Sequence, residues 1–296
     1  MIVSASRRTD IPAFYAAWFA HRLRMGWCEV ANPFNPKQVS RVSLRREDVD
    51  AFVFWTRHAR PFLKVLPLLE AAAHRSVFQY TITGYGPPVE LRTPALEVAV
   101  AAFRELAERM PPGAVVWRYD PILVGPAYPA ARHREIFARI ADGLEGATGR
   151  VVVSLVDVYA KTRRRLGKVL RWGADLAEDP PAWPGVDDLL RDLAAIAGDH
   201  GLEIEACAEP RDLAPLGIPP TKCVDDRLLA ALYGGSWPTG EDRGQRPACR
   251  CIPSRDIGRV DTCLFGCRYC YATRSDALAR RRHREHDPAA PALWSR

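Results

Sequence analysis

Three cysteines near the C-terminal end of the chain have the residue type and spacing for metal chemistry. The stretch reads Cys263-Leu-Phe-Gly-Cys267-Arg-Tyr-Cys270, so three and then two residues separate the thiols of this cysteine triad. Thiolates are soft ligands that suit iron–sulfur clusters, zinc or copper(I), and the spacing differs from both the bacterial ferredoxin run and the zinc ribbon. Three close cysteines would bind three irons of a four-iron cluster and leave the fourth iron open, and an open iron can do chemistry.

Further cysteines precede the triad. Cys249 and Cys251 have a Cys-x-Cys spacing that is poorly suited to one iron, but with Cys223 or Cys207 they could hold a second metal centre. Such a centre would be an auxiliary iron–sulfur cluster or a structural zinc with four thiolates, and the sequence leaves both open. Cys28 lies far away in the sequence and is expected to be a small buried apolar residue.

The triad, with Tyr269 directly before its last cysteine, resembles the Cys-x3-Cys-x-aromatic-Cys signature of radical S-adenosylmethionine (SAM) enzymes. The resemblance implies a [4Fe-4S] cluster that binds SAM at its open iron, with Tyr269 near the SAM. It also implies an electron donor such as flavodoxin or ferredoxin. Radical SAM enzymes usually carry the motif after their first strand, and often a Gly-Gly-Glu after the second. Here the motif is C-terminal, and the sequence contains no Gly-Gly-Glu.

A second resemblance extends over a longer part of the chain. Its residues are Gln245-Arg246-x-x-Cys249-x-Cys251-x-x-Ser254-x-Asp256-Ile257-Gly258, running into Cys263. The N-terminal stretch Ser4-Ala5-Ser6-Arg7-Arg8-Thr9-Asp10-Ile11-Pro12 carries it as well. Both stretches resemble an uncharacterised bacterial family, domain of unknown function 1848. The resemblance implies membership of that family over nearly the whole chain, without an established fold or reaction.

Composition limits the class of protein. With 296 residues, of which 48% are hydrophobic, the chain is long enough for one α/β barrel or two domains. Eight cysteines in a core-rich chain of this length favour metal binding or catalysis in the cytoplasm over a secreted disulfide scaffold. No run of roughly 18 apolar residues predicts a membrane span. The net charge of +7, carried mostly by arginine, leaves a nucleic-acid partner open without requiring one.

Strands alternating with helices must position these side chains. The expected strands are 2–6, 27–32, 51–56, 77–83, 115–120, 151–156 and 202–208, and the expected helices are 11–25, 61–73, 94–109, 132–144, 159–171 and 186–197. This alternation predicts an α/β fold with a parallel sheet, a (β/α) barrel or partial TIM-like barrel over residues 1–215. An open doubly wound sheet is the alternative. Residues 216–296 are expected to form a cysteine-rich, cluster-binding extension and basic tail packed on the barrel mouth.

Polar residues interrupt several of these strands. Because alternate strand residues point to opposite faces, Gln79, Thr81 and Thr83 share one face, as do Arg118 and Asp120. A barrel's outer face is covered by helices, so the polar sets should point inward, and the carboxyl ends of the strands line the functional mouth. The candidate catalytic residues are Arg118, Asp120 and Glu209, and the candidate cofactor-binding residues are Arg7, Arg8, Asn32, Thr83 and Tyr269.

Simpler explanations compete for some of these residues. Arg118 and Asp120 could only pair with one another, and Asp10 is better explained as a cap of the helix that follows it. Lone histidines such as His133 fit exposed helix or loop positions, so no ligand role is assigned to them.

The expected function is radical SAM-type catalysis on a small-molecule or nucleic-acid substrate. One alternative is a non-radical [4Fe-4S] hydro-lyase, which would need a base such as Glu209 or Asp157. The other is a zinc-bearing nucleic-acid-binding protein, which would use the cysteines structurally and its arginines for phosphate.

Overall fold

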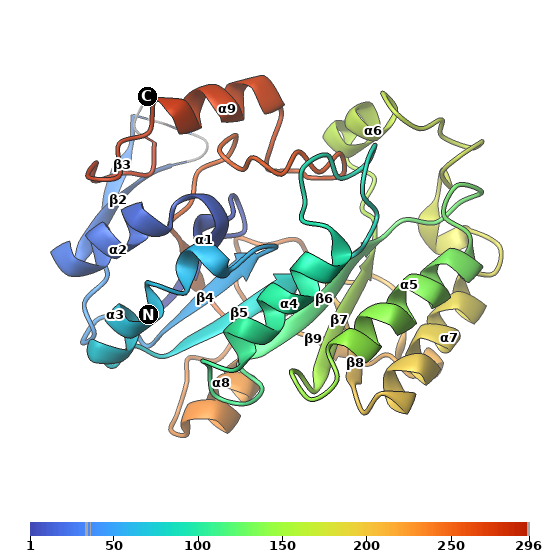
Figure 1. The fold of residues 1–296 in the computed structure, drawn as a ribbon, viewed down its shortest axis with the longest axis horizontal. Coiled ribbons are helices and arrows are strands. Elements are labelled where there is room, and N and C mark those ends of the chain that lie inside the picture. The colour runs from blue at the N-terminus through green and yellow to red at the C-terminus, as the bar shows by residue number, and fades with distance from the viewer. Residues whose placement is uncertain (33–34, 36, 295–296) are drawn as a thin grey trace.

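The computed structural model describes residues 1–32, 35 and 37–294. Its centre is a sheet of eight parallel strands in the order β10-β1-β4-β5-β6-β7-β8-β9 (Figure 1). The strands are β1 Ile2–Ala5, β4 Ala51–Thr56, β5 Ser76–Thr81, β6 Val115–Ile122, β7 Arg150–Leu155, β8 Glu203–Cys207, β9 Pro220–Thr221 and β10 Ser254–Asp256. The sheet curls into a half-barrel with β9 and β10 at its edges, which confirms the predicted α/β partial barrel.

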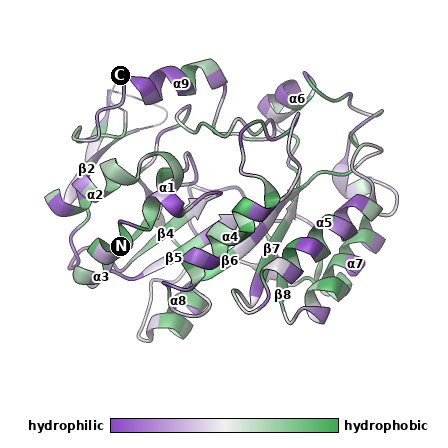
Figure 2. Cartoon of the chain, in the orientation of Figure 1, coloured by the Kyte–Doolittle hydropathy of each residue, from purple (hydrophilic) through white to green (hydrophobic). Residues whose placement is uncertain are grey.

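Helices connect the strands. They are α1 Ile11–Phe14, α2 Ala16–Met25, α3 Leu66–Ala71, α4 Leu96–Ala107, α5 Ala130–Gly143, α6 Ala160–Leu166, α7 Val186–Asp199, α8 Asp226–Tyr233 and α9 Asp276–Arg284, with short 3-10 turns at Arg60–Phe62, Pro180–Ala182 and Ala214–Leu216. Helices α1 to α5 and α7 contribute to the core on the outer face of the sheet, whereas α8 packs on the inner face. Figure 2 shows both hydrophobic and hydrophilic residues along α4, α5 and α7, as expected of helices that pack one face on a sheet.

The predicted helix over residues 11–25 is divided at Tyr15 into α1 and α2. Asp10 begins it as expected, because its Oδ1 accepts a hydrogen bond from the backbone N–H of Ala13 (2.9 Å). Gly26 ends α2 in the left-handed conformation (φ 75°), which glycine adopts without a steric penalty. The prediction that Asp10 caps a helix is therefore confirmed.

The strand predicted over residues 27–32 forms, but its expected place in the barrel is wrong. Residues Trp27–Ala31 form β2, which pairs antiparallel with β3 (Val39–Ser43) in a separate two-stranded sheet. The segment between the two strands is too short for the crossover that a parallel neighbour requires, so a hairpin forms instead. Three residues of that segment, 33, 34 and 36, lie outside the described part of the chain.

The two faces of the large sheet pack against different parts of the chain. The outer face carries large aromatic side chains, among them Phe54, Phe78 and Trp117, which pack under the helices. The inner face carries smaller residues that pack against the C-terminal part of the chain; its core includes Val53, Val77, Val116, Val152, Val224, Leu229 and Trp237. The strands are therefore apolar on both faces, as buried parallel strands are.

The C-terminal part of the chain is built into the sheet as well as packed on it. Both edge strands, β9 and β10, come after residue 216, so the predicted division at that residue runs through the sheet. In β10, Asp256 accepts hydrogen bonds from Ser4 Oγ (3.1 Å), Ser6 Oγ (2.8 Å) and the backbone N–H of Arg7 (2.9 Å). These bonds fix the extension beside the first strand.

No helix within residues 1–32 and 37–294 is both long and apolar enough to cross a membrane.

Candidate functional site

A cavity of about 720 Å³ lies at the carboxyl ends of the parallel strands. Its wall includes residues at or just after the ends of five strands: Arg7 after β1, Thr56 in β4, Asp120 in β6, Leu155 in β7 and Cys207 in β8. The three cysteines of the triad line the same cavity. The C-terminal motif thus reaches the edge of the sheet at which functional groups gather in barrels of this kind.

The loop that carries the triad is held by backbone hydrogen bonds and not by regular secondary structure. Its two ends meet where the Asp261 N–H donates to the Ala272 carbonyl (2.9 Å). A segment following β5 holds its middle, because Arg92 N–H donates to Phe265 O (3.1 Å) and Arg268 N–H donates to Val89 O (2.8 Å). The Arg92 and Val89 partners are remote in sequence from the triad, so the position of the triad depends on the tertiary fold.

The environment of the triad disfavours free thiolates. Burial raises the pKa of the Cys267 thiol to about 12, although the Arg57 guanidinium acts in the opposite direction. Burial also raises the pKa of Cys263 well above its usual range, and nearby Asp10, Cys270 and Cys267 add to the effect. A bound metal cation replaces the thiol proton, so that the thiolate becomes the favoured form of each cysteine.

Behind the triad lies a hydrogen-bonded network that includes two of the predicted cofactor-binding residues. Thr83 Oγ1 donates to Glu90 Oε1 (2.6 Å), and the Tyr269 hydroxyl donates to the same carboxylate. Arg57 forms an ion pair with Glu90 (2.9 Å) and also hydrogen-bonds to the Tyr269 hydroxyl. Arg57 and Tyr269 line the cavity, whereas the nearly buried Glu90 orients them from behind.

Sequence reasoning missed Arg57 and Glu90. Arg57 directly follows β4, so the rule that nominated strand-end residues would have found it had the strand's end been extended by one residue. Glu90 belongs to the loop after Gly84-Tyr85-Gly86-Pro87-Pro88 and carries no comparable signal.

Arg7 and Arg8 lie where β1 meets the cavity. The Arg7 guanidinium lies over the Trp55 ring (4.9 Å to the ring centroid), and Arg8 Nε lies 3.9 Å from Asp256 Oδ1. Among the described residues, Arg7 Nη2 and Thr9 Oγ1 are buried without a hydrogen-bond partner, and both residues line the cavity. Because an unsatisfied buried donor costs free energy, these two atoms mark a place for an acceptor group on a ligand.

Arg118 and Asp120 lie in another part of the cavity wall. Arg118 Nε donates to Asp120 Oδ2 (3.1 Å), and Nη1 donates to Gln79 Oε1 (3.2 Å) and to Cys223 Sγ (2.9 Å). Burial acts to raise the pKa of Asp120, but Arg118 and the Ser154 hydroxyl outweigh it, so the pKa lies below its usual value. Arg118 is therefore fully engaged with its neighbours and directs one donor at a sulfur.

Three of the predicted site residues, Asn32, Thr83 and Glu209, do not line this cavity, and Thr83 belongs instead to the Glu90 network behind the triad. Asn32 lies away from the cavity because it follows β2, a strand that is not part of the large sheet. Its side-chain nitrogen donates to Gln38 Oε1 (2.8 Å) in the hairpin. Glu209 lines a neighbouring cavity of about 110 Å³, and its Oε1 accepts from the Leu155 N–H (2.7 Å). The chain turns away from the β8 direction at Ala208, which has a positive φ of 54°. Burial raises the pKa of Glu209 to about 7.

Four other cysteines line the large cavity: Cys207, Cys223, Cys249 and Cys251, here called the second sulfur group. All eight cysteines of the chain have free thiols. Within the described ranges, no three histidine, cysteine, aspartate or glutamate side chains are grouped around a single metal-ion position. A polynuclear cluster sets a different requirement, because each of its thiolates binds a different iron. The donor set of the triad fits such a cluster.

No curated protein matches the chain. Among solved structures, the crystal structure of a putative alpha-L-fucosidase from Bacteroides thetaiotaomicron is 10% identical, with 82% of this chain and 83% of that chain covered and a TM-score of 0.28. A metagenomic short-chain oxidoreductase in complex with NADP is 14% identical, with 86% and 96% covered and a TM-score of 0.25. TM-scores this low carry no argument about fold or function. Residues 2–272 match the family described as a domain of unknown function (DUF1848), and the chain belongs to that family.

Proposed function

We propose that this protein is an iron–sulfur enzyme of the radical SAM type, with a [4Fe-4S] cluster on Cys263, Cys267 and Cys270. The observation that carries the proposal is the shared cavity: three thiols with the spacing of a site-differentiated cluster line the same space as Arg7 Nη2, a buried donor with no hydrogen-bond partner among the described residues. A cluster with three protein ligands leaves one iron for a ligand, and the cavity of about 720 Å³ is large enough for a nucleoside-sized molecule beside it.

Cys263, Cys267 and Cys270 would hold the cluster, which when bound would supply the one-electron reductive cleavage of SAM needed for hydrogen-atom abstraction from the substrate. This chemistry belongs to the cofactor, and the protein supplies binding, orientation and exclusion of water. The substrate class stays open between a small molecule and a nucleic acid.

The residues around the cavity have separate tasks in this proposal. Arg7 offers its buried Nη2 to the SAM carboxylate, because a guanidinium can form paired hydrogen bonds to a carboxylate. Tyr269 presents an aromatic side chain whose hydroxyl is fixed by Glu90, so the ring keeps one orientation beside the triad. Arg118 is engaged with Asp120 and Cys223, so it positions these two groups and does not itself hold the carboxylate.

The hydro-lyase alternative fits the geometry less well, because it needs a free carboxylate base in the cavity. Glu209 lines the neighbouring cavity, and Asp157 forms an ion pair with Arg246. The proposal also places the protein in the cytoplasm with a flavodoxin or ferredoxin as electron donor, since a low-potential cluster on free cysteines requires a reducing compartment.

The experiment is anaerobic purification followed by iron and sulfide analysis and electron paramagnetic resonance (EPR) of the reduced protein, with and without SAM. The proposal predicts a reduced-cluster signal that changes when SAM is added, and this SAM-dependent signal should be absent from Cys267→Ala. Cys28→Ala, at a buried cysteine that lies outside the cavity lining, should keep the signal. An unchanged signal and unchanged iron content in Cys267→Ala would show that the triad is not the ligand set.

A further inference from the structure

We propose that the second sulfur group, Cys207, Cys223, Cys249 and Cys251, binds a second, thiophilic metal centre in the wall of the same cavity. This inference goes beyond the proposed function and does not rest on it, because it uses other cysteines and other observations.

The four thiols form one continuous group although they come from distant parts of the sequence. Cys207 ends β8, Cys223 follows β9, and Cys249 and Cys251 precede β10. The sulfurs of Cys207 and Cys223 are 2.7 Å apart. The Cys251 sulfur is tied to the Cys223 segment, because it accepts a hydrogen bond from the Cys223 backbone N–H (3.3 Å), and Cys249, two residues before Cys251, lines the same cavity. Four thiols are the full ligand number of a tetrahedral zinc site or of a protein-bound [4Fe-4S] cluster.

Backbone and side-chain hydrogen-bond donors point at these sulfurs, an arrangement that is typical of thiolates bound to a metal. The backbone N–H groups of Cys223 and Val224 both donate to Cys251 Sγ, at 3.3 and 3.4 Å. Arg118 Nη1 donates to Cys223 Sγ at 2.9 Å. Four thiolates leave a metal centre with a net negative charge, and donors of this kind stabilise that charge and tune the metal.

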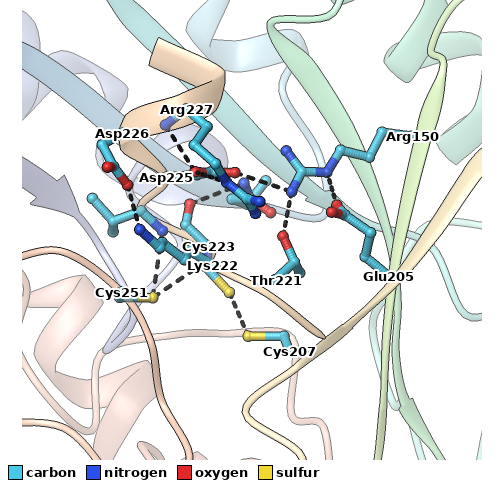
Figure 3. Close-up of polar contacts among 12 residues, drawn as sticks. Arg150, Glu205, Cys207, Thr221, Lys222, Cys223, Asp225, Asp226, Arg227 and Cys251 are labelled. Atoms are coloured by element: carbon cyan, nitrogen blue, oxygen red, sulfur yellow. Dashed lines mark hydrogen bonds and ion pairs between the residues drawn. The ribbon is translucent and has the colours of Figure 1, made fainter. Parts of the chain in front are cut away.

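A second layer of contacts holds the segment that carries Cys223 in place (Figure 3). Arg150 in β7 forms ion pairs with Glu205 and Asp225 (3.1 Å to Asp225) and also hydrogen-bonds to Thr221 Oγ1. Asp225 in turn caps α8 by accepting from the backbone N–H of Arg227 (3.0 Å). The segment 221–225 is therefore anchored on both sides of its cysteine, which is what a preorganised metal ligand needs.

Ordinary core packing explains this group less well. Buried cysteines often act as small hydrophobes, as Cys28 does. The second sulfur group instead lines an open cavity and receives a hydrogen bond from a buried guanidinium, which calls for an anionic acceptor. Metal binding would need the thiols to rearrange, because within the described part of the chain no three of them surround a single metal-ion position. In a tetrahedral site with metal–sulfur bonds of about 2.3 Å, sulfurs lie about 3.8 Å apart, so Cys207 and Cys223 must separate by about 1 Å.

The test is metal analysis of the full chain after anaerobic purification, together with two variants and a control. Cys223→Ser/Cys251→Ser should lose the second metal and keep the triad's iron, while Cys267→Ala should lose the triad's iron and keep the second metal. Cys28→Ser is the matched control and should bind the same metal as the wild type. Loss of about four irons and four sulfides in the double variant identifies an iron–sulfur cluster, and loss of about one zinc identifies a mononuclear site.

The double variant overturns the inference if it binds the same metals, in the same amounts, as the wild type. If it fails to fold, alkylation of the wild-type protein decides instead. The inference predicts that iodoacetamide modifies the four cysteines of the second sulfur group only after a chelator has removed the metal, while Cys28 stays unmodified in both states. Equal modification of the four before and after chelation overturns it. The Cys267→Ala variant tests the triad alone, and the double variant tests the second sulfur group alone. Failure of the proposed function can therefore be told apart from failure of this inference.

Discussion

Arg7 joins three parts of the molecule, and its contacts orient it into the cavity. Its backbone N–H is held by Asp256 (2.9 Å), its Nη1 lies 3.4 Å from Ser254 Oγ, and its guanidinium lies over Trp55. The remaining nitrogen, Nη2, is buried without a partner among the described residues. A side chain fixed in this way has lost its rotamer freedom before a ligand arrives, which lowers the entropic cost of the SAM contact proposed for Arg7.

Arg7→Gln should weaken SAM binding about tenfold or more, because a charge-assisted hydrogen bond contributes about 1.5–3 kcal/mol. Titration of the reduced protein with SAM, followed by EPR, measures the change. Arg75→Gln is the matched control, since Arg75 also lies over an aromatic ring, that of Trp237 (5.3 Å), but does not line the cavity. Equal SAM affinity in Arg7→Gln and the wild type would remove Arg7 from the ligand site.

His133 shows how tertiary structure overrides a sequence expectation. It was expected to be exposed, but it is 1% exposed; its Nδ1 pairs with the Tyr119 hydroxyl (2.8 Å) and its Nε2 with Leu123 O (2.6 Å). Burial lowers its pKa to about 4. His133 lies in α5, and its residue type alone could not show whether its side chain faces the sheet or the solvent.

This lowered pKa predicts a pH-dependent stability. The unfolded chain takes up the His133 proton near its ordinary pKa and the folded chain only near 4, so this contribution is present above about pH 6.5 and is lost as the pH falls. Between pH 7 and pH 5 the free energy of unfolding should drop by about 2 kcal/mol from this group alone. Urea unfolding at both pH values should show a smaller drop for His133→Gln than for the wild type. An equal drop would mean that other groups cause the pH dependence.

At the scale of elements, the close approach of β1 and the segment after β10 depends on a glycine. A Cβ at Gly258 would lie 2.0 Å from Ser6 Oγ and 2.6 Å from Ser6 Cβ. Ser6 cannot move freely, because its hydroxyl is bound to Asp256 Oδ1 (2.8 Å). A methyl group at this position must therefore push the two segments apart.

Gly258→Ala should lower the free energy of unfolding by about 2 kcal/mol, as overpacking commonly does. It should also reduce iron retention, because the same segment leads into the triad. Gly198→Ala is the control: it lies in α7 with no atom within 4 Å of the added Cβ, so it should be neutral or stabilising by less than about 1 kcal/mol. Chemical denaturation compares the two, and similar curves for both variants would contradict the steric argument.

The sequence predicted those elements that have long, regular patterns. Alternation of strands and helices led to the parallel sheet, and β4 was predicted with its observed bounds, Ala51–Thr56. The hairpin of β2 and β3 was missed because one apolar strand looks the same in a barrel and in a hairpin. Strands β9 and β10 were missed because two or three residues are too few to show a period. The parallel pairing of β10 with β1 joins residues some 250 positions apart, and nothing local in the sequence indicates it.

The candidate site was predictable to a similar degree. The cysteines could be nominated from spacing, and Arg7, Arg118 and Asp120 from strand ends; all of them line the large cavity. Glu90 and Arg57 required the three-dimensional structure, because their importance comes from their contacts with Tyr269. Glu209 was nominated by counting along a strand, but the backbone turns at Ala208, and such a turn is a property of the folded chain.

At the scale of the whole molecule, the two ends of the chain build one site together. The segment after the N-terminal strand supplies Arg7 and Arg8, and the C-terminal part supplies the triad and most of the second sulfur group. Contacts such as Tyr15 Oη to Thr262 O (2.8 Å) and Tyr271 Oη to Arg7 O (3.0 Å) fasten these parts to each other. A motif that usually follows the first strand in radical SAM enzymes can thus reach an equivalent edge of the sheet from the other end of the chain.

The central claim is that this cavity supports reductive cleavage of SAM. The most direct measurement is formation of 5′-deoxyadenosine by the anaerobically reconstituted, reduced protein, quantified by liquid chromatography and mass spectrometry. The account predicts 5′-deoxyadenosine and methionine in equal amounts from the wild type and from Cys28→Ala, and none above background from Cys267→Ala. Iron-loaded, reduced protein that leaves SAM intact, or a Cys267→Ala variant that cleaves it as well as the wild type, would contradict the account.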